Sequence, residues 1–291
     1  MTTKKLNIIG CGQAAGSLAR LWVETDAVRI GCVMNQSETS SRRAIDRLGA
    51  GKASSSLTDM GPADVWLIGT NDDQVERVAM AMQSRGEELG GSLVFHLAGR
   101  FGLEVLESLD DGQTLLAAMH PVRSLTTAGL TLNDFAGTAC VAEGTPPALA
   151  ALQPLVDSIG GRWLPVASID RGLYHASVSI ISNVTKAVAW KAQKWQKKAG
   201  LPEETAAAVT HQLLASTVDD LFRSGARQSI TGPVVRGDTS TIKAHIEALS
   251  ANHPEDLVVY RVLAHTVLEL AQERGDLDEK TLRRFEDLFE T

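Results

Sequence analysis

The residues with the clearest chemical potential form a glycine-rich turn near residue 10. Gly10-Cys-Gly12-Gln-Ala-Ala15-Gly16 fits the pattern Gly-x-Gly-x-x-Ala and follows an apolar run that ends at Ile9. Gly10 allows a tight turn, the missing Cβ of Gly12 lets a pyrophosphate approach the backbone, and small residues let the next helix pack closely. Amides at the start of that helix favour phosphates. The turn predicts dinucleotide binding, and a merely tight strand–helix connection is the alternative.

The segment after the apolar run Val28–Met34 bears on which dinucleotide is bound. A site that prefers NAD(H) usually has Asp or Glu at the end of its second strand, but this chain has Asn35 there. Ser37 and Arg42 follow, and hydroxyl and guanidinium groups bind a 2′-phosphate. We therefore expect NADP(H), with NAD(H) less favoured. Glu38 counts against phosphate binding, and the alternative makes Arg42 a solvated helix residue.

Polar side chains also follow three later apolar runs. Thr70 and Asn71 come after Val65–Gly69, His96 stands near the end of the next run, and His120 follows the one after it. Ligands of open α/β sheets bind beyond the carboxyl ends of the strands. We therefore expect the two histidines to face one crevice, where either contacts substrate or nicotinamide. In the alternative, His96 is a satisfied buried histidine and His120 only ends a strand. The predicted cofactor-binding residues are Gly10, Gly12, Gln13, Ala14, Ala15, Asn35, Ser37, Arg42, Thr70 and Asn71.

Further polar groups gather in the second half of the chain. His175, Ser179, Ser182 and Asn183 are about four and eight residues apart, so a continuous helix would place them on one face. Buried polar groups need partners, and a substrate is one candidate. A helix that packs against other helices, with its polar groups bonded to carbonyls or water, is the equally weighted alternative.

The loop Thr231–Asp238 carries Arg236, whose guanidinium suits a carboxylate or phosphate. Gly232 and Gly237 indicate special backbone geometry, and Asp238 is placed to cap the helix that follows it. A purely structural connection between helices is the alternative.

The elements that must position these residues divide the chain into two parts. Short apolar runs alternate with helical patterns up to residue 166, which predicts right-handed βαβ units and a mainly parallel sheet covered on both faces. From about residue 169 only helical patterns remain. We therefore predict an α/β domain at residues 1–166 and an all-α domain at residues 167–291. The expected strands are Lys5–Ile9, Val28–Met34, Val65–Gly69, Ser92–Leu97, Thr114–Met119, Thr138–Val141 and Arg162–Val166. The expected helices are Gln13–Val23, Ser40–Leu48, Asp73–Met82, Pro147–Ile159, Asp170–Ala199, Glu203–Phe222, Ser240–Leu249, Glu255–Glu273 and Glu279–Phe289.

Composition narrows the class of protein. The 291 residues are 44% hydrophobic, an ordinary value that excludes a disordered chain. The 28 basic against 35 acidic residues, a formal charge of −7, disfavour a general nucleic-acid or anionic-membrane binder. The three scattered cysteines indicate neither a disulfide framework nor zinc, and no other metal-ligand spacing is present. The run Leu6–Ile9 is too short for a signal peptide, and no apolar run is long enough for a membrane span. We expect a cytoplasmic enzyme with a small-molecule substrate.

Together these segments resemble Rossmann-like proteins whose second half is a domain of unknown function, commonly labelled oxidoreductases. The resemblance covers most of the chain. More distantly, the chain is similar to the 6-phosphogluconate dehydrogenase superfamily, including pyrroline-5-carboxylate, ketopantoate and β-hydroxyacid reductases. This similarity implies an N-terminal NADP-binding Rossmann-like domain, a helical C-terminal dimerisation domain that forms a homodimer, and a site between them. The segments that carry the resemblance are Gly10–Gly16, His96-Leu-Ala-Gly99, His120-Pro-Val-Arg-Ser124, Tyr174-His-Ala176 with Ser182-Asn183, and Thr231–Asp238 with His245.

One departure from that superfamily affects the chemistry. In β-hydroxyacid dehydrogenases and ketopantoate reductases a catalytic Lys precedes a helix Asn by four residues, whereas Ser179 precedes Asn183 here, and Lys186 lies one turn later. His175 is a replacement proton donor, because an imidazole with an ordinary pKa near 6.5 exchanges protons at neutral pH. Pyrroline-5-carboxylate reductase also lacks such a lysine, which leaves imine reduction open. We assign catalytic roles to His175, Asn183 and His120, and substrate binding to His96, Ser124, Ser182 and Arg236.

These expectations combine into one functional hypothesis. The chain is expected to be an NADP(H)-dependent oxidoreductase that transfers a hydride to or from a small anionic carbonyl or imine compound. Asn183 would orient the substrate and Arg236 would hold its carboxylate. A non-catalytic dinucleotide-binding sensor or partner protein is the alternative, and the missing lysine favours it. A third hypothesis, a structural helical dimer with a degenerate nucleotide fold, predicts no cofactor binding.

Overall fold

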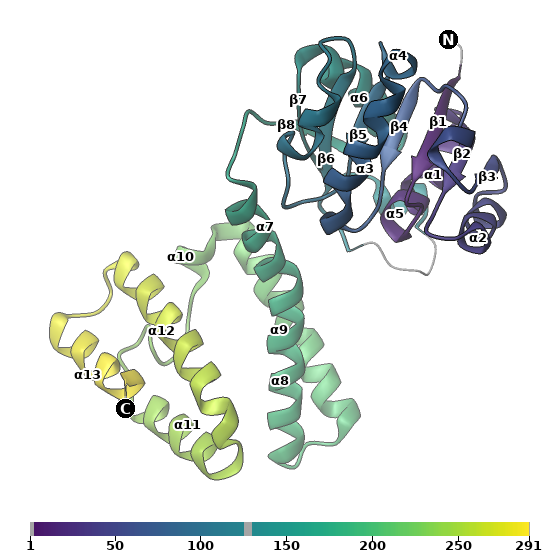
Figure 1. Ribbon diagram of the computed structural model, residues 1–291. Helices are drawn as coiled ribbons and strands as arrows, with labels where there is room; N and C mark the ends of the chain where they lie inside the picture. The colour runs from purple at the N-terminus through teal and green to yellow at the C-terminus, as the bar shows by residue number, and fades with distance from the viewer. Residues whose placement is uncertain (1–2, 125–129, 291) are drawn as a thin grey trace. The chain divides into compact units, whose positions relative to one another are not determined.

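A computed structural model describes residues 3–124 and 130–290 of the chain. The chain forms two compact units, Met1–Ser182 and Asn183–Thr291, the first built on a β-sheet and the second entirely helical (Figure 1). The predicted fold class, an α/β domain followed by an all-α domain, is confirmed. The units divide later than residue 166 because the helix after the sheet, α7 (Arg171–Ser179), is held to the sheet by Arg171 and Tyr174.

The first unit contains an eight-stranded sheet in the order β3-β2-β1-β4-β5-β6-β7-β8. Neighbouring strands are parallel except β6 and β7, which are antiparallel. The chain runs outward from β1 to β3 on one side and resumes at β4 on the other, so the strand order reverses at β1 and β4, where open α/β sheets bind ligands. The strands are β1 (Lys4–Ile9), β2 (Val28–Met34), β3 (Lys52–Ser54), β4 (Val65–Ile68), β5 (Leu93–His96), β6 (Leu115–Pro121), β7 (Ala139–Gly144) and β8 (Arg162–Pro165).

Helices cover both faces of this sheet, which explains why its central strands are apolar throughout. In β4, Leu67 faces the core formed with α1, α2 and α6, whereas Trp66 and Ile68 face the core formed with α3 and the 3-10 helix η4. Their side chains alternate because successive strand residues point to opposite faces. The helices of this unit that precede α7 are α1 (Gln13–Glu24), α2 (Glu38–Leu48), η1 (Leu57–Asp59), η2 (Asp72–Gln74), α3 (Val75–Met82), η3 (Gln83–Arg85), α4 (Gly86–Leu89), η4 (Glu104–Leu109), α5 (Leu132–Phe135) and α6 (Pro146–Ser158).

The helix predicted at Asp170–Ala199 is interrupted. It consists of α7, a π-helical segment η5 (Ile180–Val184) and α8 (Thr185–Lys198). It begins where the Asp170 side chain accepts the Leu173 N–H, and it ends before Gly200, whose φ is +102°. The four polar residues expected on one face are therefore divided between α7 (His175, Ser179) and η5 (Ser182, Asn183), and their sharing of a face stays a prediction. Such π-helical segments are frequent at functional sites.

The second unit has its own apolar core between α11, α12, α13 and the Gly/Pro-containing loop. As predicted, Gly232 and Gly237 have positive φ angles, and Asp238 caps α11 by accepting the Thr241 N–H. Across the described ranges, no helix combines the length and the apolar character needed to cross a membrane. The remaining helices are α9 (Glu203–Ser224), α10 (Ala226–Ser229), α11 (Thr239–Asn252), η6 (Pro254–Asp256), α12 (Leu257–Arg274) and α13 (Glu279–Glu290).

Candidate functional site

The glycine-rich turn lies at the carboxyl end of β1, between the strand and α1. Gly10 has φ +82°, and a Cβ there would lie 2.5 Å from the backbone nitrogen of Thr70, so the fold itself requires glycine. Gly12 is different: it has φ −74°, and a Cβ would meet nothing closer than the Gly69 oxygen at 3.8 Å. No packing demand inside the chain explains glycine at position 12.

The start of α1 fits a pyrophosphate group. Gly12 is the N-cap residue, and within the described residues the helix start has no side-chain cap hydrogen bond. Gly12 and Gln13 are exposed, and Ala14 is half-buried. Ala15 is fully buried and packs against Gly69, which brings the helix close to β4. Beside the turn, the buried hydroxyl of Thr70 has no hydrogen-bond partner among the described residues. Open amide donors at a helix N-terminus are an anion-binding arrangement.

The predicted ribose-contacting residues follow β2, next to the turn. Asn35 accepts the Cys11 N–H at 2.7 Å through Oδ1 and donates to the Ser40 carbonyl at 3.0 Å through Nδ2. Ser37 caps α2 by accepting the Ser40 N–H. Asn35 thus braces the turn and Ser37 begins the helix. The guanidinium of Arg42 is exposed and pairs with the Glu38 carboxylate. Of the three predicted ribose-contacting residues, only Arg42 carries a charge.

Two histidines meet at the carboxyl ends of β5 and β6. The rings of His120 and His175 lie 6.0 Å apart between centroids at an angle of 74°. Both lie against the backbone of Gly99, because a Cβ there would be 2.8 Å from His175 Cδ2 and 3.0 Å from His120 Nε2. The structure therefore brings together the His96–Gly99 loop, the end of β6 and α7. Gly99 was missing from the predicted site, although its motif was recognised.

Tyr174 completes this cluster. Its hydroxyl is 2.9 Å from His120 Nδ1, and the two rings are nearly perpendicular. Burial, followed by the charges of His175 and Arg171, lowers the pKa of His120 to about 4. His120 is therefore neutral at physiological pH. We did not predict a role for Tyr174 from the sequence, since nothing but its position beside His175 marked it out.

A buried ion pair fixes α7 on the sheet. Arg171 donates from Nε and Nη2 to one oxygen of Glu143 on β7, at 2.9 and 2.8 Å. The two side chains are 6% and 13% exposed. The Arg171 guanidinium also lies 5.9 Å from the ring centre of Tyr174. The pair was invisible in the sequence because its members are 28 residues apart in different elements.

His96 is fully buried, and both of its ring nitrogens are engaged by backbone. Nε2 is 2.8 Å from the Gly102 carbonyl oxygen, and Nδ1 accepts the Ala98 N–H at 3.1 Å. With its pKa lowered by burial, the ring is neutral. No ring nitrogen is left for a substrate, so the structure favours the alternative that His96 is a satisfied buried histidine shaping the loop to Gly99.

The other residues predicted to bind substrate are divided between the two units. The hydroxyls of Ser124 and Ser182 are 3.4 Å apart within the first unit, and Ser182 is in the π-helical segment. Asn183 and Arg236 belong to the second unit, where both are exposed. The meeting of Asn183 and Arg236 with the two histidines stays a prediction.

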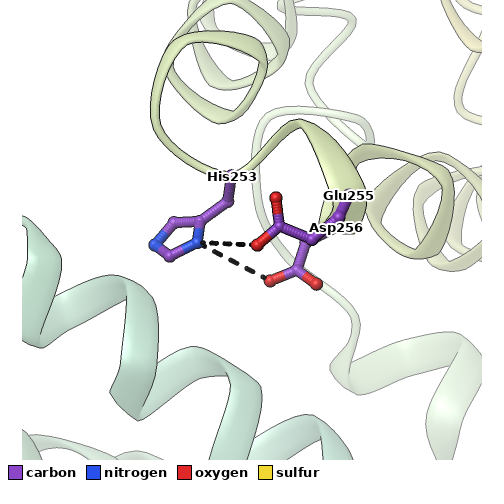
Figure 2. Close-up of side chains that lie close together, drawn as sticks. All are labelled: His253, Glu255 and Asp256. Atoms are coloured by element: carbon purple, nitrogen blue, oxygen red, sulfur yellow. Dashed lines mark ion pairs between the residues drawn. The ribbon is translucent and has the colours of Figure 1, made fainter.

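A second cluster of potential ligands lies at the corner before α12, where the atoms of His253, Glu255 and Asp256 face one another (Figure 2). His253 Nδ1 is 3.5 Å from a Glu255 oxygen and 4.0 Å from Asp256 Oδ2. The Asp256 carboxylate, 1% exposed, also pairs with Lys191 and accepts the Trp195 indole N–H at 2.9 Å, contacts that lower its pKa. A cation here would compete with the Lys191 ammonium group, so the cluster joins α8 to this corner.

Comparison with known families finds a match for part of the chain. Residues 138–267 match the model of a domain of unknown function, DUF2520. The match begins just before β7 and ends within α12, so it spans parts of both units. The match confirms the part of the predicted resemblance that concerns a domain of unknown function in the second half of the chain. No curated protein matches the chain.

Solved structures show the same fold at low sequence identity. A candidate NADP oxidoreductase from Bacteroides fragilis is 21% identical with a TM-score of 0.71, covering 91% of this chain and 98% of its own. An imine reductase from Myxococcus stipitatus in complex with NADP⁺ is 14% identical with a TM-score of 0.64, covering 97% and 99%. A pyrroline-5-carboxylate reductase from Coxiella burnetii is 17% identical with a TM-score of 0.59, covering 99% of both chains. These likenesses establish the fold.

Proposed function

We propose that this protein is an NADP(H)-dependent oxidoreductase that reduces, or forms, a small anionic carbonyl or imine compound. The observation that carries the proposal is the shared sheet edge. The open N-terminus of α1 follows β1, and the pair His120 and His175 lies where the parallel strands β5 and β6 end. Ligands of such sheets lie at this edge. The fold of a candidate NADP oxidoreductase and of an imine reductase with NADP⁺ supports the same reading.

The residues divide the work by chemistry. The amides at Gly12 and Gln13 bind the pyrophosphate, and Arg42 contacts the 2′-phosphate that distinguishes NADP(H) from NAD(H). The bound nicotinamide supplies the hydride chemistry. During reduction, His175 donates a proton to the oxygen or nitrogen of the C=O or C=N group, while the carbon gains the hydride. Asn183 orients the substrate and Arg236 holds its carboxylate.

The test is turnover of a panel of keto acids and cyclic imines with NADPH, followed as loss of NADPH absorbance. We expect His175→Ala to lower kcat by about 10²–10⁴-fold, the usual contribution of a positioned proton donor. His211→Ala is the matched control, because His211 is an exposed histidine on α9 in the other unit. Unchanged turnover in His175→Ala would remove this residue from the mechanism.

A non-catalytic dinucleotide sensor is the second candidate. The absence of a lysine at position 179, four residues before Asn183, favours it. Ser179 stands where relatives of the similar superfamily have a catalytic lysine. This function predicts tight NADPH binding with no oxidation of NADPH by any compound in a broad metabolite panel. Turnover of a single substrate would exclude it.

We also propose that the protein forms a homodimer through its helical unit. The helix α9 exposes large apolar side chains, among them Leu213 at 63% and Phe222 at 85%. Exposed apolar surface on a helix is a candidate interaction site. A second copy of the chain is expected to cover it, and light scattering should give twice the chain mass. Leu213→Glu should yield the monomer mass, and a monomeric wild type would contradict the proposal.

A further inference from the structure

The hydrogen bond between His120 and Tyr174 can run in either direction, and the roles predicted for His120 do not decide which group donates. The Tyr174 hydroxyl oxygen and His120 Nδ1 are 2.9 Å apart, and either atom is able to donate. If Tyr174 donates, the ring proton of His120 sits on Nε2; if His120 donates, it sits on Nδ1. The two cases present opposite chemistry to anything beside Nε2, a hydrogen-bond donor or a lone pair.

The surroundings favour Tyr174 as the donor. Burial raises the pKa of its hydroxyl above the ordinary value, so the group keeps its proton. The described part of the chain offers this hydroxyl no acceptor other than His120 Nδ1. Were Nδ1 to donate instead, the phenolic hydrogen would have no acceptor among the described residues. A neutral imidazole with an accepting Nδ1 carries its hydrogen on Nε2.

The protonated nitrogen lies against the backbone of Gly99, beside the ring of His175. His120 Nε2 and His175 Cδ2 lie 3.0 and 2.8 Å from the point that a Cβ of residue 99 would occupy. Within the described residues Nε2 has no hydrogen-bond partner of its own, and it is not among the fully buried polar atoms. A donor with no acceptor among the described residues, beside a second imidazole, is placed for an acceptor atom of a ligand.

We propose that Tyr174 is a positioning residue that holds His120 as its Nε2–H tautomer, so that His120 donates a hydrogen bond to a carbonyl or carboxylate oxygen of the substrate. The choice of substrate oxygen rests on the proposed function, whereas the tautomer does not. His175 and His120 then have different tasks. His175 exchanges a proton with the substrate, and His120 polarises it without changing its own charge.

Nitrogen-15 NMR of the full chain tests the tautomer without substrate or cofactor. Two-bond ¹H–¹⁵N spectra distinguish a protonated from an unprotonated ring nitrogen, and the signals absent from His120→Gln identify those of His120. We expect the wild type to show protonated Nε2 and unprotonated Nδ1. In Tyr174→Phe, which retains the ring contact, we expect both tautomers to be populated.

A matched control exists in the second unit, where the Tyr260 hydroxyl lies 2.8 Å from His245 Nδ1. Tyr260→Phe should leave the His120 signals unchanged. A wild-type His120 protonated on Nδ1, or a single unaltered tautomer in Tyr174→Phe, would overturn the proposal. On an active substrate, Tyr174→Phe should lower kcat/KM about tenfold, the equivalent of one hydrogen bond. The expected spectra with no turnover in the wild type would refute the proposed function and leave the tautomer assignment intact.

Discussion

Two glycines of one turn should respond in opposite ways to the same substitution. Alanine at Gly10 must adopt φ +82° and would place its Cβ 2.5 Å from the Thr70 backbone nitrogen. A non-glycine residue in such a conformation costs about 1–3 kcal/mol before the clash with Thr70 is counted. Gly12 has φ −74°, and its nearest potential contact, the Gly69 oxygen, is 3.8 Å away. Alanine is a poorer N-cap than glycine, so this substitution should lower the free energy of unfolding by about 0.5–1 kcal/mol, without strain or a clash.

The effect on the cofactor should be the reverse. An added methyl group at Gly12 occupies the space through which a pyrophosphate approaches the amides of α1. Loss of one hydrogen bond to a charged group costs about 1.5–3 kcal/mol, which raises Kd roughly 10- to 150-fold. Gly12→Ala should therefore lose little of its melting temperature and much of its NADPH affinity, whereas Gly10→Ala should lose more stability.

Thermal unfolding and calorimetric titration with NADPH measure both effects. Gly86→Ala is the control, since Gly86 lies in α4 with a negative φ and a Cβ there meets nothing within 4 Å. Equal NADPH affinity in Gly12→Ala and the wild type would refute the assignment of the turn. A Gly10→Ala variant as stable as the wild type would refute the argument from backbone geometry.

Three further outcomes follow from the charged groups. As the pH falls from 7 to 4.5, the unfolded chain binds a proton at His120 before the folded chain does, because the pKa of His120 in the folded chain is about 4. Over this range, urea unfolding should show that the wild type loses about 2–3 kcal/mol more stability than His120→Gln. Glu143→Ala leaves the Arg171 charge buried without its partner and should cost about 3–5 kcal/mol of stability. Glu38→Ala breaks an exposed pair and should cost less than about 1 kcal/mol. Equal losses of stability in the two variants would contradict the burial argument. Asp256→Asn should lower the urea midpoint, because a carboxylate 1% exposed anchors a lysine and a tryptophan, and an unchanged midpoint would contradict that role.

Much of the fold could be predicted because its elements leave local patterns. The apolar runs of β1, β2, β4 and β5 fall within a residue or two of the predicted strands, since a sheet covered on both faces needs apolar residues throughout. The strand β3 was missed because Lys52–Ser54 is short and polar. The π-helical segment was missed too, because it differs from an α-helix in hydrogen bonding and not in composition.

The candidate site was less predictable because its groups meet through the fold. His120 and His175 stood out as polar residues at a strand end and on a helix, but their meeting at Gly99 depends on how α7 lies on β6 and β7. The anchor between Glu143 and Arg171 has no local signature in the sequence. His96 follows the same sequence pattern as His120, yet both of its ring nitrogens bond to backbone. The sequence could not distinguish the two histidines, because residue type alone does not reveal which partners surround a side chain.

The most direct test of the account is a calorimetric titration of the wild-type protein with NADPH and, separately, NADH. The open N-terminus of α1 and the Thr70 hydroxyl, which has no partner in the part of the chain that the structure describes, predict one binding event per chain. NADPH should bind more tightly than NADH and raise the melting temperature. Neither heat nor thermal stabilisation with saturating amounts of either nucleotide would contradict the central claim.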